Sequence, residues 1–160
     1  MKYDVAQVVD SMKVNDVTHI IATPTLAIDL LDYIKKNNVQ LPKLKSLLAG
    51  GASVPIETAQ QFVKTVPSCV DFRIGYGATE TGPCATTCQM HHTFEQRTET
   101  VGTPLDFVEV KIVDPETNSV VPLGQCGEIL TRGFHVMLGY WKDPVKTKEV
   151  LDSAGWYNTG

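Results

Sequence analysis

A short stretch at residues 75–82, which reads GYGATETG, combines residue types that could bind a nucleotide. Tyr76 offers a flat ring that could lie against a ligand, and Thr79 offers a hydroxyl to a phosphate oxygen. Glu80 offers the hard oxygen that Mg²⁺ prefers. The glycines permit close approach of the backbone and unusual dihedral angles. These residues predict a nucleotide site, although an incidental glycine-rich surface turn would contain the same types.

The residues of this stretch do not match two familiar phosphate-binding loops. The dinucleotide pattern G-x-G-x-x-G would need glycine where Glu80 stands, and this disfavours a nicotinamide-dependent oxidoreductase. The Walker A pattern would need Gly-Lys-Ser/Thr, and the stretch contains no lysine.

The segments before this stretch alternate between helical and strand patterns. Strands are predicted at 18–23, 44–51 and 70–77, with helices around residues 5–12, from Pro24 and from Pro55 to about Val66. This order predicts parallel strands joined by right-handed helical crossovers. Ligands bind beyond the carboxyl ends of such strands, where both GYGATETG and AGGASVP (49–55) lie. The two turns could therefore line one crevice.

Helix starts are marked by residues that cap the first turn. Thr23 is a candidate N-cap with Pro24 at the first helical position, and Asp143 is a candidate N-cap before Pro144. The N-cap of the helix that starts at Pro55 is expected near Ser53 or Val54. An apolar stripe in the helix after Thr23 is expected to pack against the sheet, although it could instead line an apolar tunnel: Leu26, Leu30, Leu31 and Ile34.

The pattern changes after about residue 100. Residues 107–114 alternate as an antiparallel strand does, 115–119 form a turn, and 120–133 predict a returning strand pair. A helix is expected over 143–151, and a strand begins within 155–160. Trp141 and Trp156 are interpreted as core anchors of this lobe.

The predicted fold is therefore α/β. Residues 1–100 form a partial parallel sheet with flanking helices, and 101–160 form a small antiparallel, barrel-like β-rich lobe that is truncated at its C-terminal end. About three strands in the first part are fewer than the usual 4–6. Apolar strand edges and faces should then be exposed.

Composition narrows the class of protein. A net charge of −4 without a Lys/Arg cluster disfavours nucleic acid or an anionic membrane as partner. No apolar run approaches the roughly 20 residues that span a bilayer, and the N-terminus lacks the features of a secretory signal. Four cysteines in a chain of 160 residues favour a reduced, intracellular protein, without distinguishing cytoplasm from mitochondrion.

A second motif offers a competing chemistry. Cys84, Cys88, His91 and His92 form C-x3-C-x2-H-H, whose thiolates and imidazoles could bind zinc. All four come from one short segment, so a structural role beside the GYGATETG stretch is favoured over a metal site.

Five segments in a fixed order resemble the adenylate-forming superfamily, and most of all its medium-chain fatty acyl-CoA synthetases. They are AGGASVP, GYGATETGP, VGTP, GEILTRGFHVMLGYWKDPVKT and GWYNTG, with TPTL at 23–26 in support. The resemblance implies a ligase that uses ATP, Mg²⁺ and coenzyme A to convert a fatty acid into acyl-CoA, AMP and pyrophosphate through an acyl-adenylate. Luciferase-like or aryl-acid activity stays open.

The resemblance also assigns roles to individual residues. It implies that Gly50, Gly51 and Ala52 border the adenine and acyl pocket, and that Gly75, Tyr76, Gly77 and Ala78 form the next wall, with Tyr76 against the adenine. It implies that Thr79 bonds the α-phosphate and Glu80 holds Mg²⁺. Val101 and Gly102 would lie beside the pocket.

Several features of the resembled family are missing from the 160 residues. They are the upstream phosphate loop, the aspartate expected after Gly160, and the C-terminal domain with its lysine. The expectation is a fragment that is inactive by itself and needs flanking segments of the same parent chain. The alternative is a non-catalytic nucleotide-binding or interaction fragment.

Overall fold

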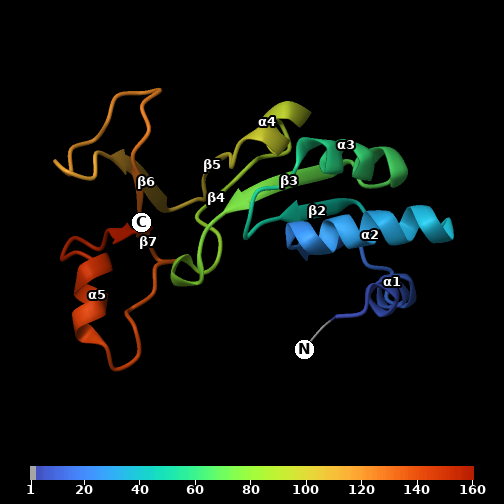
Figure 1. Cartoon of the computed structure of the whole chain (residues 1–160), viewed down its shortest axis with the longest axis horizontal. Helices are drawn as coiled ribbons and strands as arrows, with labels where there is room; N and C mark the ends of the chain where they lie inside the picture. Colours follow the sequence, from blue (N-terminus) through green and yellow to red (C-terminus); the bar gives the residue numbers. More distant parts are fainter. Residues whose placement is uncertain (1–2) are drawn as a thin grey trace. The chain divides into compact units, whose positions relative to one another are not determined.

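The structure is a computed structural model that describes residues 3–160 (Figure 1). The chain divides into two compact units. The first runs up to Gly75 and includes Thr87–Thr103, and the second consists of Tyr76–Thr86 and Pro104–Gly160. A subdomain division at residue 100 stays a prediction.

The first unit is built on three parallel strands: β1 (His19–Ala22), β2 (Ser46–Ala49) and β3 (Asp71–Tyr76). Helix α2 (Pro24–Asn37) connects β1 to β2, helix α3 (Ile56–Thr65) connects β2 to β3, and α1 (Val5–Val14) precedes them (Figure 1). In register, Ser46 of β2 lies between His19 and Asp71. The predicted parallel α/β arrangement is confirmed.

Three short elements were not predicted from the sequence. Strands β4 (Thr86–Thr87) and β5 (Thr103–Pro104) extend the sheet to five strands in the order β1-β2-β3-β4-β5. Helix α4 (Phe94–Glu99) begins at Thr93, whose hydroxyl accepts a hydrogen bond from the Gln96 amide while the Gln96 side chain accepts one from the Thr93 amide. Two-residue strands and a six-residue helix are too short to carry a periodic pattern.

Two of the three predicted helix starts are confirmed. Thr23 Oγ1 accepts from the Leu26 amide at 3.3 Å, with Pro24 at the first helical position. Asp143 Oδ1 accepts from the Lys146 amide at 2.9 Å at the start of α5 (Pro144–Val150). Helix α3 differs, because Pro55 itself is the N-cap and no side chain caps the helix.

The core of the first unit lies between the helices and the sheet. Leu30, Leu31 and Ile34 of α2 are buried, which confirms core packing of the predicted stripe. Phe62 of α3 and Phe72 of β3 are fully buried, with ring centroids 5.7 Å apart. Each such side chain contributes about 1.5–3 kcal/mol on burial. This core fixes β3, the strand that leads into the GYGATETG stretch.

A buried charge cluster ties β2, β3 and α4 together. The carboxylate of Asp71, only 4% exposed, accepts hydrogen bonds from Ser46 Oγ at 2.8 Å and Arg97 Nη1 at 3.2 Å. Arg73 donates to it as well, with Nε at 3.0 Å. Burial acts to raise the pKa of Asp71, but the hydrogen bonds from Arg73, Ser46 and Arg97 outweigh it and lower the pKa below its ordinary value.

The second unit contains an antiparallel sheet of β6 (Val108–Val113), β7 (Glu128–Gly133) and β8 (Tyr157–Asn158). This confirms the antiparallel β-rich part. The predicted strand pair over 120–133 is wrong in detail, because only β7 forms and Val120 makes one isolated bridge to Val113. Pro122 lacks an N–H for ladder pairing, and its carbonyl instead accepts from the Gln125 amide in a turn.

The two tryptophans of this unit do not share one role. Trp141 is 88% exposed, so its interpretation as a core anchor is wrong. Trp156 is half-buried, with Lys111 Nζ 4.3 Å and Arg132 Cζ 4.6 Å from its ring centroid. A large apolar side chain in a loop is buried only when another element covers it, and residue type alone does not decide this.

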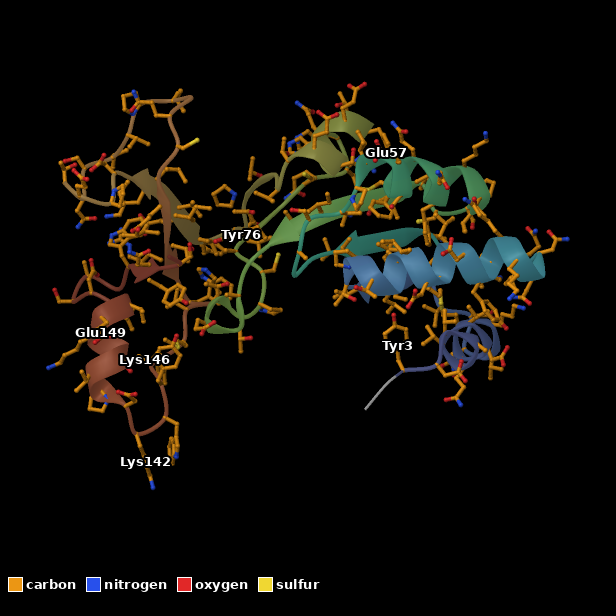
Figure 2. All side chains as sticks on the ribbon, viewed as in Figure 1. Tyr3, Glu57, Tyr76, Lys142, Lys146 and Glu149 are labelled. Carbon is orange, nitrogen blue, oxygen red and sulfur yellow. The ribbon has the colours of Figure 1, made fainter. Side chains whose placement is uncertain are left out.

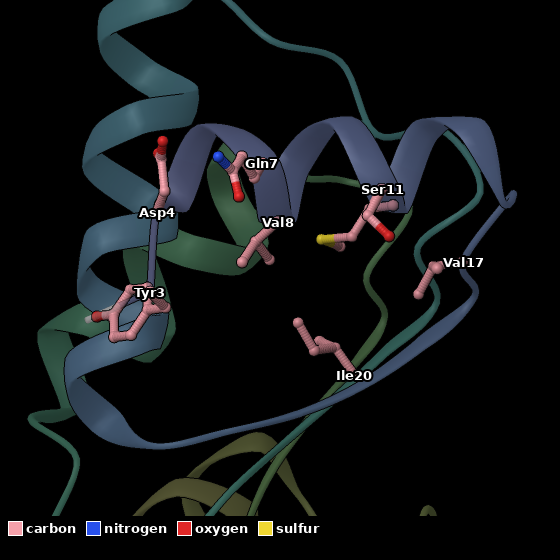
Figure 3. A pocket seen from close by; sticks show the side chains of 8 residues that line it. Tyr3, Asp4, Gln7, Val8, Ser11, Val17 and Ile20 are labelled. Carbon is pink, nitrogen blue, oxygen red and sulfur yellow. The ribbon is translucent and has the colours of Figure 1, made fainter. Parts of the chain in front are cut away.

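A hollow of about 660 Å³ lies between α1 and β1 in the first unit (Figure 3). Its apolar lining includes Val8, Met12 and Ile20, and none of the predicted nucleotide-site residues lines it. Strand β1 is at the end of the sheet order, and its Ile21 is 80% exposed. Apolar surface is therefore open to solvent along this edge.

Within residues 3–160, no helix has the length and apolar character required to cross a membrane.

Candidate functional site

The turn that follows β2 lies against the end of β3 within the first unit. The Gly50 amide donates to the Ala22 carbonyl at 3.1 Å, and a Cβ added to Gly50 would lie 3.3 Å from the Gly75 carbonyl oxygen. Gly51 has a φ of +92°, which L side chains rarely adopt, and Ala52 is exposed. The structure thus brings the predicted residues Gly50 and Gly75 together at the carboxyl ends of neighbouring strands.

In the second unit the chain folds back tightly after Tyr76. A Cβ on Gly77 would lie 2.1 Å from the Pro83 carbonyl oxygen, so only glycine fits this position. The Ala85 amide donates to the Tyr76 carbonyl at 2.8 Å and closes the turn. Gly77 is therefore required for the packing of this turn on Pro83, and its role beside a nucleotide stays a prediction.

Thr79 and Glu80 lie in one short 3₁₀ turn, η1 (Thr79–Thr81). Fully buried Thr81 fixes it: its hydroxyl accepts from the Ala78 amide at 2.8 Å and donates to the Ala78 carbonyl at 3.0 Å. Thr79 is exposed and Glu80 is half-buried. The turn holds a hydroxyl and a carboxylate on adjacent residues, and Thr81, which sequence reasoning missed, holds the turn.

Glu80 is held at two points by the loop between β7 and α5. Its backbone carbonyl accepts from the Met137 amide at 2.8 Å, and its side-chain Oε1 accepts from the Tyr140 hydroxyl at 2.9 Å. The hydrogen bond to Glu80 is the main cause that raises the pKa of Tyr140 to about 12. Tyr157 nearby also has a raised pKa, chiefly because it is buried. No sequence signal links Tyr140 to a glutamate 60 residues earlier.

Tyr76 is anchored by its hydroxyl, which donates to Thr159 Oγ1 at 3.0 Å. Tyr76 stands at the end of β3 (Figure 2), and Thr159 follows β8. The hydrogen bond fixes the ring of a half-buried tyrosine. The role of this ring against an adenine stays a prediction.

The residues present fit a magnesium–nucleotide site of the kind that relies on few protein ligands. Residues 3–160 contain no group of three or more His, Cys, Asp or Glu side chains that could hold a metal ion. Magnesium at nucleotide sites is usually bound by one or two carboxylates, with phosphate oxygens and waters completing the octahedron. Glu80 has a carboxylate that could serve in this way, and Thr79 has an adjacent hydroxyl.

The residues of the C-x3-C-x2-H-H motif make local hydrogen bonds. Cys84 Sγ donates to the Thr86 carbonyl at 3.2 Å, and burial raises the pKa of the Cys84 thiol. Buried Cys88 lies 3.3 Å from the Gln96 carbonyl, and His92 Nδ1 accepts from the Gln89 amide at 3.2 Å. These contacts are all local to residues 84–96, and the structural role of the motif stays a prediction.

The segment that the sequence placed beside the pocket lies against Thr87, within the first unit. Val101 is 38% exposed, and Gly102, with φ +74°, packs on the Thr87 carbonyl. Its placement beside a nucleotide stays a prediction.

Comparison with known proteins adds an independent line of observation. The sequence profile of the family described as AMP-binding enzyme matches residues 1–141. The mitochondrial medium-chain acyl-CoA ligase ACSF2 of Danio rerio is 36% identical over 143 residues, covering 89% of this chain and 23% of the relative. 4-coumarate–CoA ligase 3 of Oryza sativa subsp. japonica is 30% identical over 161 residues, covering 99% of this chain and 29% of the relative.

The crystal structure of ATP-bound MatB from Rhodopseudomonas palustris has a TM-score of 0.82 and 26% identity, covering 99% of this chain and 30% of that chain. The chain thus spans about a quarter of the length of these two curated relatives. The resemblance to medium-chain acyl-CoA ligases that the motifs predicted is confirmed. Because the family profile matches residues 1–141, which is most of its length, the chain belongs to the AMP-binding enzyme family.

Proposed function

We propose that this chain is the part of an acyl-CoA synthetase that forms one wall of its adenylate site. The observation that carries the proposal is the tight turn after β3, where Gly77 admits no side chain and η1 presents Thr79 and Glu80 together. This turn follows the carboxyl end of a parallel strand, where α/β sheets bind ligands. Relatives that activate carboxylic acids with coenzyme A support the choice of ligase.

The proposed reaction has two steps. A carboxylate oxygen of the acid attacks the α-phosphorus of ATP, the new P–O bond forms, and the bond to the β-phosphate oxygen breaks to release pyrophosphate. The thiol of coenzyme A then loses its proton to water, and its sulfur attacks the acyl carbonyl carbon. The bond from that carbon to the phosphate oxygen breaks, and AMP leaves with the electron pair.

Each residue of the turn has a role in the first step. Thr79 donates its hydroxyl to an α-phosphate oxygen, where negative charge gathers as the acid attacks. Glu80 binds Mg²⁺, and when bound the ion supplies positive charge against the phosphate oxygens. Tyr76 packs against the adenine, and Gly75, Gly77 and Ala78 form the same wall beside it.

The turn that follows β2 supplies a second set of residues to the proposal. Gly50, Gly51 and Ala52 border the adenine and the acyl chain, and their small side chains leave room for both. Medium-chain fatty acids are the proposed acids, because a medium-chain acyl-CoA ligase is among the relatives. Catalysis of this kind depends mainly on positioning and charge neutralisation, which a rigid turn provides.

The test is acid-dependent exchange of labelled pyrophosphate into ATP, measured on the polypeptide encoded by the complete reading frame. Medium-chain, long-chain and aromatic acids are compared, and coenzyme A is then added to detect the thioester. Glu80→Gln is expected to lower exchange roughly 100-fold, the scale of one lost charge-stabilising group. Glu149→Gln, on the exposed face of α5 (Figure 2), is the matched control.

Two results would overturn the proposal. One is the absence of exchange with every acid, and the other is equal activity of the Glu80 and Glu149 variants. Exchange with aromatic acids alone would leave the proposed ligase activity standing but show that the substrate is an aromatic acid and not a medium-chain fatty acid.

A further inference from the structure

The hydrogen bond between Tyr140 and Glu80 is a contact that the proposed function does not yet use. Tyr140 lies in the loop between β7 and α5, and its hydroxyl donates to Glu80 Oε1 at 2.9 Å. The same loop binds the Glu80 backbone through the Met137 amide at 2.8 Å. The backbone and the side chain of Glu80 are therefore both held by one loop of the same unit.

Tyr140 is itself fixed by the start of α5. Its amide donates to Thr147 Oγ1 at 2.9 Å, and that hydroxyl donates to the Asp143 carbonyl at 2.7 Å. Lys146 (Figure 2) places its Nζ 5.2 Å from the centroid of the Tyr140 ring. A phenol whose backbone and ring are both engaged points its hydroxyl in one direction.

We infer that Tyr140 is a positioning residue that orients the Glu80 carboxylate for a divalent cation. By donating to Oε1, the hydroxyl would restrict rotation of the carboxylate and leave Oε2 as the oxygen that could bind the cation. This inference rests on the proposed function, because it assumes that Glu80 binds the metal of a metal–nucleotide complex.

The physical basis is the cost of ordering a ligand. A free glutamate side chain loses rotamer entropy when it binds a metal, and a carboxylate already held by a hydrogen bond loses less. Groups that orient metal ligands typically change metal affinity 10–100-fold. Since Glu80 is half-buried and keeps access to water, the lower end, about tenfold, is expected for Tyr140.

The experiment uses Mn²⁺ with ATP as probe and the 160-residue chain labelled with ¹⁵N. Bound Mn²⁺ broadens the amide signals of nearby residues, so broadening of the Thr79–Thr81 signals reports occupancy at Glu80. The variants are Tyr140→Phe, which removes only the hydroxyl, and Glu80→Gln. Tyr33→Phe, which removes a hydroxyl on α2 in the other unit, is the matched control.

The expected result is that Tyr140→Phe needs about tenfold more Mn²⁺ for half-maximal broadening, while Tyr33→Phe matches the unsubstituted chain. The remaining amide signals of Tyr140→Phe should stay in place, which a collapse of the fold would not allow. One contrary outcome is broadening of the Thr79–Thr81 signals at the same Mn²⁺ concentration in Tyr140→Phe and in the unsubstituted chain, but not in Glu80→Gln. In that case this inference fails and the metal site at Glu80 stands. If Glu80→Gln broadens like the unsubstituted chain, the proposed metal role of Glu80 fails, and the inference with it.

A second measurement covers the case in which Tyr140→Phe does not fold. The five tyrosines of the chain are labelled with 3-fluorotyrosine, and Mg²⁺ with ATP is added to the otherwise unsubstituted chain. The ¹⁹F signal of Tyr140 should shift on addition, and the shift should be absent in Glu80→Gln. A Tyr140 signal that ignores the metal would overturn the inference.

Discussion

Replacement of Gly77 by alanine is the sharpest test of the turn that carries Thr79 and Glu80. The added Cβ would lie 2.1 Å from the Pro83 carbonyl oxygen, a distance that must grow to at least 3.0 Å. The backbone therefore has to move by at least 0.9 Å, the difference between these two values. Such movement strains the Ala85–Tyr76 hydrogen bond that closes the turn.

The cost follows from these two effects. Overpacking against backbone costs about 1–3 kcal/mol, and a weakened buried hydrogen bond adds about 1 kcal/mol. We therefore expect Gly77→Ala to lower the free energy of unfolding by about 3 kcal/mol. For a chain of this length, that corresponds to a melting temperature lower by about 6–12 °C.

The assay is thermal unfolding followed by far-ultraviolet circular dichroism, with Gly124→Ala as the control in the same unit. Gly124 has a φ of +86° with nothing within 4 Å of an added Cβ, so its substitution introduces backbone strain of about 1 kcal/mol without a clash. If Gly77→Ala melts no lower than Gly124→Ala, the turn is not held by contact with Pro83 and the reasoning is refuted.

Three further predictions concern charge, activity and association. The pKa of Asp71 is lowered in the fold, so its stabilisation is present above its unfolded pKa of about 3.9 and is lost as pH falls through the lower folded value. Urea unfolding between about pH 2 and 7 should therefore show a free energy of unfolding that falls with falling pH. Asp71→Asn should weaken this pH dependence and lower the free energy of unfolding by about 3 kcal/mol at about pH 7. The same pH dependence in both proteins would contradict this prediction. The 160-residue chain with fatty acid, ATP and Mg²⁺ should release no pyrophosphate above the blank, and robust turnover would be incompatible with the inactive fragment. The open edge at β1, with Ile21 exposed, should cause concentration-dependent association in sedimentation experiments, whereas a monodisperse, cooperatively melting monomer would count against it.

Long periodic segments were predictable because local sequence decides them. The stripe of α2 and the β-branched run of β1 carry patterns that span the whole element, and Thr23 with Pro24 marks where the helix begins. The shortest elements, such as β4, were missed because pairing with a distant strand creates them. The exposure of Trp141 was missed for the related reason that no neighbouring element covers its loop.

The candidate site shows the same division between local and distant information. The glycines and polar residues of 75–82 identify a turn, and the packing of Gly77 on Pro83 is local to that turn. The partners of the two candidate site residues Glu80 and Tyr76 are not local, since Tyr140 and Thr159 lie 60 and 83 residues further along the chain. Patterns within a short window carry no information on such pairs.

The contact between Tyr76 and Thr159 has a consequence for the order of events during synthesis. Translation at about 5–20 residues per second separates the emergence of these two residues by about 4–17 s. Tyr140 likewise emerges after the glutamate that it binds. The Tyr76 side of the site therefore stays without its anchoring hydrogen bonds on the ribosome for seconds, while the helices and strands of the first unit can already pack. A nascent-chain experiment should find Tyr76 accessible to tyrosine-directed reagents until β8 has left the exit tunnel.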